Sequence, residues 1–443
     1  MGTTFKVTSI CTQLEAILEL DSNESTQFIK DNLIKTRTFT LPMHPILIRQ
    51  LSAPSFLPRY NERRVLQVIR RMGEASKADL ARQTNLTNTA VGTIVSALHR
   101  KQLLTISSKR LNGRRGQPAT LYRLEATGSF SIGVRVDRNW IQVILIDFNG
   151  TVLSRLSHEL VLPKPEIALE IILKDINALL DMLSENQRHR LSGIGLAYPY
   201  NLESWLNELS LPYEEFSCWK EFDLAGHIED AISIPVCSEN DVTAASIAEF
   251  FYGVGRDMDD FLYVFIGPAI GGGIVINGES VRGPMGNAGD IGLMPVPPST
   301  LISVPQPKGK WDILLNRASI NTLIRHLRAC GHEIYSLSDV NFLVDRQDKA
   351  VNEWMTDCVA ALTPVLWSAV ALLNSPVVVI GSDLGTGFIR LLITKLEQKL
   401  ASSAPEARTP PQLLSGSFGS DAEAIGAANL PFFYHFSTQN HIE

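Results

Sequence analysis

The sequence has little cysteine and little charge, and each shortage excludes a class of protein. Its five cysteines lie far apart, without a CxxC pair, which argues against a disulfide framework and against a thiolate zinc site. Only 19% of its residues are charged, and 45% are hydrophobic, a proportion usual for a soluble chain with a sizeable core. Because its 443 residues far exceed the usual domain length of about 150, we expect two or three domains.

Long hydrophobic runs are also missing. The longest, residues 358–373, is interrupted by Thr363, Pro364 and Ser368, and it falls short of the roughly 20 residues that a membrane span needs. We therefore predict a buried core helix there and no membrane partner. No secretory leader pattern opens the chain, so the expected location is the cytoplasm.

Positive charge is scarce overall but concentrated in one segment. The net charge is −6, yet residues 60–125 hold thirteen Lys and Arg against four Asp and Glu, a local net of +9. The rest of the chain then carries −15. A basic block on an acidic chain favours a module that binds a polyanion, although a solvated basic surface would give the same count.

The basic block has the pattern of three short helices. Ser76 and Asp79 have the spacing of a capping box, Thr87 or Asn88 is suited to cap the next helix, and Gly73 is suited to end the first. Helices are predicted over residues 63–71, 77–83 and 88–101. Because the turn between the last two is short, the pattern predicts a helix-turn-helix.

A basic hairpin follows these helices. Strands are predicted over 103–106 and 120–124, and they flank a glycine-rich basic tip, a combination typical of a winged helix that binds DNA. We assign this domain to residues 59–126 and treat residues 1–58 as a poorly defined extension. The predicted DNA-binding residues are Thr87, Asn88, Thr89, Thr93, Arg114 and Arg115. For the polar residues among them, an ordinary solvated surface is the plain alternative.

Residues 127–443 have the pattern of an α/β domain. Strands are predicted over 131–136, 141–147, 151–156, 191–196, 234–237, 261–266, 274–276 and 376–380, with residues 267–273 as a glycine-rich turn. Helices are predicted over 166–183, 224–231, 243–252, 311–330, 351–373, 386–400 and 421–429. Alternating strands and helices predict sheets covered on both faces, with a ligand site at the carboxyl ends of the strands, where Asn240 and Asp241 fall. No internal repeat of fixed period is evident.

Four motifs in order resemble the ROK family of repressors, open reading frames and kinases. They are Glu239-Asn240-Asp241, and the segments 244–249, 270–278 and 283–292. Gly116-Gln117-Pro118 resembles a further segment that follows the winged helix of the family's regulators. The resemblance covers about residues 63–431. It implies a winged helix-turn-helix followed by a two-lobed, actin-like domain of the glucokinase type.

The resemblance also implies a sugar site. In the family's kinases, the residues matching Asp241 and Asn240 are the general base and a ligand of a sugar hydroxyl, and Asp290 matches a further sugar ligand. A neighbouring carboxylate and carboxamide are able to bond adjacent hydroxyl groups. A structural alternative is an aspartate that caps the helix beginning at Thr243.

Departures from the family pattern argue against catalysis. Arg135 stands where the kinases have the aspartate of their metal–phosphate loop, and that loop's glycines are missing from residues 135–140. The second phosphate turn reads Gly-Pro-Ala-Ile-Gly at 267–271, which removes a hydroxyl and an N–H group. Without a cradle for the triphosphate, phosphoryl transfer lacks its main stabiliser. We therefore predict no catalytic residue and no cofactor.

The zinc site of the family is missing as well. Leu293 stands at the position of the family's zinc-binding histidine, and residues 295–312 contain no cysteine, so no metal is predicted. Tyr200 follows Pro199 where the family usually has glycine, which bears on sugar specificity.

The sequence thus favours a sugar-responsive transcriptional regulator, a repressor of carbohydrate-utilisation genes, with a degenerate kinase domain as its sensor. Its expected partners are operator DNA, a sugar or sugar derivative, and a second copy in a homodimer or a dimer of dimers. Two alternatives are a bifunctional sugar kinase with a DNA-binding head and a ligand-blind DNA-binding dimer.

Overall fold

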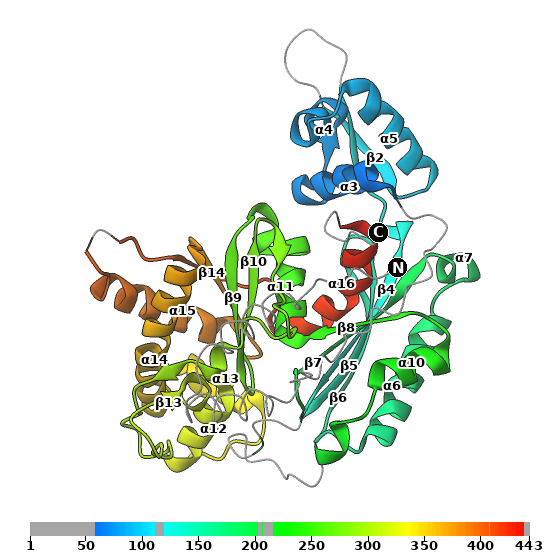
Figure 1. The fold of residues 1–443 in the computed structure, drawn as a ribbon. Helices are drawn as coiled ribbons and strands as arrows, with labels where there is room; N and C mark the ends of the chain where they lie inside the picture. Colours follow the sequence, from blue (N-terminus) through cyan, green and yellow to red (C-terminus); the bar gives the residue numbers. More distant parts are fainter. Residues whose placement is uncertain (1–57, 111–118, 203–205, 207–215, 407, 438–443) are drawn as a thin grey trace, which may run out of the picture. The chain divides into compact units, whose positions relative to one another are not determined.

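Two sheets with the same strand order form the body of the protein (Figure 1). The structure is a computed structural model that describes residues 58–110, 119–202, 206, 216–406 and 408–437. In each sheet the strands, counted along the chain, lie in the order third, second, first, fourth, fifth. The second strand is antiparallel to the first and third, and the fourth and fifth run parallel to the first. Each sheet with its covering helices is one lobe, so the expected two-lobed α/β fold is confirmed.

The first lobe is built on the order β6-β5-β4-β7-β8. Its strands are β4 (Phe130–Asp137), β5 (Trp140–Asp147), β6 (Val152–Glu159), β7 (Leu191–Tyr198) and β8 (Val236–Asn240). The helices α6 (Pro165–Asp181) and α10 (Leu224–Ile232) pack together and contact this sheet, and the short α7 (Glu185–Arg188) precedes β7. The C-terminal helix α16 (Ala422–Phe436) also packs on this sheet, and β4 and β5 are buried along nearly their whole length.

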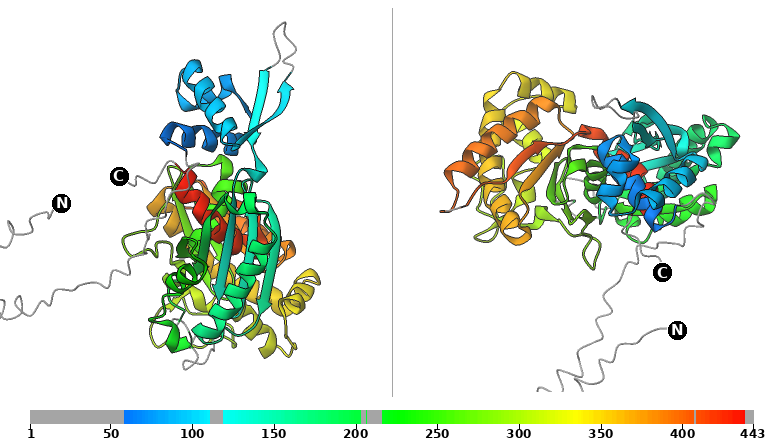
Figure 2. Two further views of the ribbon diagram at one scale, coloured as in Figure 1. Left: turned by 90° about the vertical axis from the view of Figure 1, so that its right-hand side faces the viewer. Right: turned by 90° about the horizontal axis from the view of Figure 1, so that it is seen from above.

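The second lobe is built on the order β11-β10-β9-β14-β15. Its strands are β9 (Phe261–Ile266), β10 (Ile270–Ile276), β11 (Glu279–Ser280), β14 (Val377–Ser382) and β15 (Gln412–Ser415). Its helices are α12 (Ile320–Ala329), α13 (Leu337–Asp345), α14 (Lys349–Leu373) and α15 (Thr386–Ser402), with a small ladder of β12 (Pro295–Val296) and β13 (Asp312–Ile313) before them. Helix α11 (Asp241–Tyr252) contacts both β10 and α16, and so it joins the two lobes (Figures 1 and 2).

The segment before the first lobe holds three helices and a small sheet. They are α3 (Tyr60–Met72), α4 (Lys77–Thr84) and α5 (Asn88–Arg100), followed by β2 (Leu104–Arg110) and β3 (Ala119–Leu124). A two-residue strand that the sequence did not predict, β1 (Ala75–Ser76), pairs with β3. The predicted capping box is present, because Ser76 accepts from the Asp79 N–H and Asp79 accepts from the Ser76 N–H.

Several sequence predictions in the second lobe were wrong. The helix predicted over 311–330 is α-helical only in α12, because Ser319 caps a new helix start. Helix α13 and strand β15 were not predicted. Residues 271–273 are strand, not turn, so the loop between β9 and β10 is only 267–269. Glycine is required there because a Cβ on Gly271 would lie 2.8 Å from the Val242 side chain of α11.

Two prolines lie inside helices. Helix α16 continues past Pro431, although the pattern predicted an end near residue 429, because all of its residues are buried against neighbouring elements. Helix α14 contains Pro364 and is the one helix in the described part of the chain that is long and apolar enough to span a membrane. Half of its most apolar window is buried, and its Trp354, Cys358 and Leu362 belong to the main core cluster of the second lobe.

Candidate functional site

A cavity of about 350 Å³ lies at the carboxyl ends of the strands, between the two lobes. From the first lobe it is lined by the residues that follow β4, β7 and β8, and from the second lobe by the loop between β9 and β10. The three residues predicted as sugar ligands, Asn240, Asp241 and Asp290, all line this one cavity. Parallel strands explain the placement, because their carboxyl ends meet at one edge of a sheet.

Asn240 lines the cavity and also caps a helix. Its Oδ1 accepts from the N–H groups of Val242 and Thr243, each at 3.1 Å, and so it is the N-cap of α11. The predicted alternative, an aspartate as the cap, was wrong, because Asp241 is already the first residue of the helix. Both lone pairs of the Asn240 Oδ1 are occupied, so a ligand hydroxyl would meet only its Nδ2 donor.

Asp241 is buried at the start of the same helix. Its Oδ1 accepts from the Val242 N–H at 2.7 Å. Burial, assisted by the negative charge of Asp137, raises the pKa of Asp241 to about 6, while the Val242 N–H, Arg135 and Arg138 act in the opposite direction. A carboxylate with such a pKa accepts a hydrogen bond at neutral pH and is able to take up a proton in mild acid.

Asp290 faces the cavity from the second lobe together with Asn287. The Asn287 Nδ2 donates to the Asp290 Oδ2 at 3.0 Å, and burial raises the pKa of Asp290 despite this bond. Leu293, at the position of the family's zinc-binding histidine, also lines the cavity and is half exposed. This wall therefore offers a carboxylate, a carboxamide and an apolar surface to a ligand, and sequence reasoning had not selected Asn287.

Next to the cavity, Arg135 lies in a buried cluster of carboxylates. It forms ion pairs with Glu423 of α16, with Asp383 after β14 at 3.3 Å, and with Asp137 of its own strand at 3.9 Å. Its Nη1 also donates to the Ser420 carbonyl at 3.0 Å. The guanidinium thus connects the first sheet, the second sheet and the C-terminal helix.

The charges of this cluster depend on one another. Burial opposes the charge of Arg135, but the carboxylates of Glu423, Asp383 and Asp137 outweigh it and raise the pKa of the guanidinium. Burial raises the pKa of Glu423 well above its usual range, and it raises that of Asp383, although Arg135 lowers both. The cluster is therefore held by a permanently charged cation that partly compensates a group of buried acids.

The segment that resembles the phosphate loop of the ROK kinases is a tight hairpin. Strand β4 pairs with β5 up to Asp137 and Trp140, so only Arg138 and Asn139 form the turn. The buried Arg138 side chain donates to the carbonyl groups of Asn201 at 2.9 Å and Leu202 at 3.2 Å. This second arginine closes the part of the cavity next to β7.

The predicted DNA-binding residues fall into two groups. Thr87 is the N-cap of α5 and accepts from the Ala90 N–H at 3.2 Å, and it is exposed together with Asn88 and Thr89. Thr93, one turn later, is also exposed and donates to the Thr89 carbonyl at 3.2 Å. These four residues therefore lie together on the N-terminal half of α5. Arg114 and Arg115 lie outside the described residues.

Comparison with known proteins identifies the family. The ROK family profile matches residues 131–431, and the chain belongs to this family. The xylose repressor of Bacillus spizizenii is 23% identical over 377 residues, which cover 85% of this chain and 96% of the repressor.

Two solved structures share the fold. A ROK family transcriptional regulator, a homologue of the E. coli MLC protein, has a TM-score of 0.63 at 22% identity and covers 84% of this chain and 95% of its own. A ROK family glucokinase from Streptomyces griseus, solved with glucose and AMPPNP, has a TM-score of 0.55 at 20% identity and covers 68% and 99%. Regulators and a kinase are thus both built on this fold.

Proposed function

We propose that this protein is a sugar-responsive transcriptional repressor whose kinase-like body senses the sugar and does not phosphorylate it. The observation that carries the proposal is the pairing of a cavity lined by Asn240, Asp241 and Asp290 with a buried arginine beside it. Polar groups that converge in a largely preformed cavity are typical of a small-molecule site. Similarity to a xylose repressor supports a sugar as the ligand and DNA as the partner.

Arg135 is the main argument against phosphoryl transfer. A kinase of this fold needs carboxylates to hold Mg²⁺ and backbone N–H groups to hold phosphates. Here the guanidinium is already paired with Asp137, Asp383 and Glu423, and the loop that follows its strand is a two-residue hairpin. A metal–nucleotide complex would have to displace this cation from buried acids.

The basic segment supports DNA binding. Helices α4 and α5, joined by a short turn, and the antiparallel pair of β2 and β3 support the winged helix-turn-helix that we propose for residues 59–126. The exposed hydroxyl and amide groups at the start of α5 are suited to base edges and phosphates. We further propose a cytoplasmic homodimer that binds a palindromic operator.

Helix α11 connects the cavity with this segment. Helix α11 begins at Asp241, in the cavity, and ends with Phe251 and Tyr252, whose rings lie 4.8 and 5.7 Å from the buried guanidinium of Arg70 in α3. A ligand that binds one position of α11 better than another would therefore also shift α3.

The next residue of α3 makes a second contact with the same region. Arg71 donates to the carbonyl groups of Arg256 and Met258, at 2.9 and 3.0 Å, and pairs with Asp259 at 2.6 Å. All three partners lie just beyond the end of α11, so Arg71 is placed to transmit a movement of that helix.

Sugar binding is tested by calorimetric titration of the full chain with hexoses, pentoses and amino sugars. We expect at least one sugar to bind. Asp290→Asn should lower the affinity for that sugar by about tenfold or more, since one hydrogen bond to a charged group contributes about 1.5–3 kcal/mol. The control is Asp181→Asn, an exposed aspartate of α6 that pairs with Arg188. Binding by no sugar of the panel would refute the sensing role.

DNA binding is tested separately. The full chain selects fragments from genomic DNA, and fluorescence anisotropy then measures the affinity of one selected fragment with and without the bound sugar. Asn88→Ala is expected to weaken specific binding by about 1–3 kcal/mol. Selection of no sequence would refute the repressor while leaving the sugar site in place.

The sugar kinase remains the second candidate, because Asp241 keeps a position and a pKa suited to a general base. An assay that couples ADP release to a visible signal decides between the two. Sugar-dependent ADP release that Asp241→Asn abolishes would replace our proposal with the kinase.

A further inference from the structure

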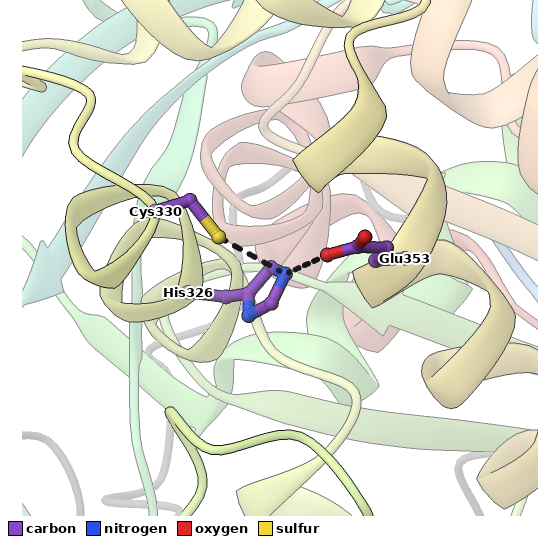
Figure 3. A group of neighbouring side chains, drawn as sticks. All are labelled: His326, Cys330 and Glu353. Atoms are coloured by element: carbon purple, nitrogen blue, oxygen red, sulfur yellow. Dashed lines mark hydrogen bonds and ion pairs between the residues drawn. The ribbon is translucent and has the colours of Figure 1, made fainter.

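Three side chains of the second lobe converge far from the cavity residues in sequence: His326, Cys330 and Glu353 (Figure 3). His326 and Cys330 lie one turn apart at the end of α12, and Glu353 comes from the first turns of α14. The His326 Nε2 lies 3.7 Å from the Cys330 Sγ and 3.6 Å from the Glu353 Oε2. One ligand atom from each residue lies within 4.8 Å of the other two.

The two separations from the His326 Nε2 fit a tetrahedral metal ion, and the sulfur and the carboxylate oxygen lie within 4.8 Å of each other. With zinc bonds of about 2.0–2.3 Å to nitrogen, sulfur and oxygen, two neighbouring ligand atoms lie roughly 3.3–3.6 Å apart. Of the two distances from the His326 Nε2, 3.6 Å lies at the upper end of this range and 3.7 Å exceeds it by about 0.1 Å. We propose that His326, Cys330 and Glu353 bind one divalent cation of the zinc class, with water in the fourth position. A nitrogen, a thiolate and a carboxylate together favour zinc over the harder Mg²⁺ and Ca²⁺.

The surroundings of the histidine hold it in a suitable position. The Ser303 Oγ lies 2.8 Å from the His326 Nδ1, and its oxygen is able to accept the Nδ1 proton. With the proton on Nδ1, the lone pair of Nε2 is free to face the sulfur and the carboxylate. A metal requires this tautomer of the histidine. The histidine is buried, whereas the cysteine and the glutamate are exposed, so an ion has access from solvent.

The same contacts have a metal-free explanation that an experiment can separate. A histidine protonated on Nε2 could donate to Glu353, whose other oxygen lies 3.5 Å from the Lys349 Nζ. The sequence-based expectation of no metal rested on the wide spacing of the five cysteines, Cys330 among them, and on the residues near Leu293, so this proposal departs from that expectation. The pattern was overlooked because a spacing of four residues on one helix, completed by a third residue from another, has no local signature.

The test is a titration of the full chain, reduced and freed of metal, with Zn²⁺ against a chromophoric chelator. We expect about one equivalent to bind, and Co²⁺ to give visible d–d bands and a near-ultraviolet band from a thiolate ligand. Cys330→Ser should weaken Zn²⁺ binding by tenfold or more and remove the thiolate band. Ser303→Ala should weaken it by about 10–100-fold. The control is Cys218→Ser, at an exposed cysteine of the first lobe, which should change neither the affinity nor the thiolate band.

The metal-free explanation predicts other results. Absence of bound Zn²⁺ in the wild-type chain, or a Co²⁺ spectrum without a thiolate band, would overturn the proposal without use of any variant. Equal affinities of Cys330→Ser and Cys218→Ser would overturn it as well. Because Cys330 is exposed, its replacement by serine should not affect folding, which the thermal unfolding of the metal-free variants checks.

Discussion

Replacement of Arg135 by methionine should convert a compensated ion cluster into an excess of buried negative charge. Methionine is long enough to fill much of the space, so the main loss is the guanidinium that pairs with Glu423, Asp383 and Asp137. Removal of one partner from a buried ion pair costs about 3–5 kcal/mol of folding free energy. For lobes of this size, that loss lowers the Tm by roughly 6–20 °C.

The loss should depend on pH. The folded-state pKa values of Glu423 and Asp383 are raised by burial even with Arg135 present, and they rise further without it. A carboxyl group with a raised pKa contributes most to stability below its unfolded pKa of about 4, and this contribution is lost as the pH rises. The variant should therefore lie closer to the wild type at pH 5 than at pH 8.

The measurement is thermal unfolding at constant ionic strength, with Arg155→Met as the control. Arg155 pairs with Asp421 at 2.7 Å, but half of its side chain is exposed, so its loss should cost less than about 1 kcal/mol. A second substitution, Glu423→Gln, should restore part of the stability that Arg135→Met removes, since it deletes one unpaired acid. Equal Tm values for Arg135→Met and the control at pH 8 would refute the reasoning, and so would a loss that is the same at both pH values.

Three further predictions follow from single residues. Burial raises the pKa of Asp241 to about 6, so the wild type loses stability relative to Asp241→Asn as the pH rises from about 4 to 6. At pH 7 the relative gain of Asp241→Asn should be roughly 3 kcal/mol. A Tm difference between the two proteins that does not vary with pH would contradict this. Thr93→Ala should weaken operator binding by about 1 kcal/mol. The control is Thr394→Ala, which should not weaken it, because Thr394 is an exposed threonine of α15 that likewise donates to the carbonyl four residues before it. Equal affinities of the two variants in the anisotropy assay would exclude Thr93 from the DNA-binding surface. Arg71→Ala should leave sugar affinity within about twofold but reduce the sugar-induced change in DNA affinity, and an unchanged response would exclude Arg71 from the coupling between α11 and α3.

Local patterns predicted the segments whose signals are short-range. The capping box of Ser76 and Asp79 lies where the sequence placed it, and Thr87 is the cap of the two residues that the sequence allowed, since caps depend on residues about three positions apart. The prediction over 311–330 failed because its apolar spacing continued through a capped break at Ser319. Helix α16 exceeded its predicted length because burial of the whole helix outweighs the local cost of Pro431.

The candidate site shows the same division between sequence and structure. The motif around Asn240 and Asp241 indicated which residues would line a sugar cavity, and the strand pattern placed them at the carboxyl ends of a sheet. The sequence did not show that the Asn240 side-chain oxygen accepts hydrogen bonds as the N-cap of α11, nor that the Asn287 side chain donates to Asp290. Hydrogen bonds of this kind depend on where two separate segments meet.

By itself, the sequence determined the alternation of strands and helices and the concentration of basic charge before residue 126, and its resemblance to the ROK family implied the loss of that family's phosphate and zinc residues. These are properties of residue type and spacing, and no contact between distant segments is needed to recognise them. Only the tertiary structure decided that two sheets share one strand order without a detectable sequence repeat. It alone placed Arg135 among acids from β4, β14 and α16, and brought Glu353 to the His326 and Cys330 of another helix. Packing brings such residues together from distant parts of the chain, where no periodicity along the sequence relates them.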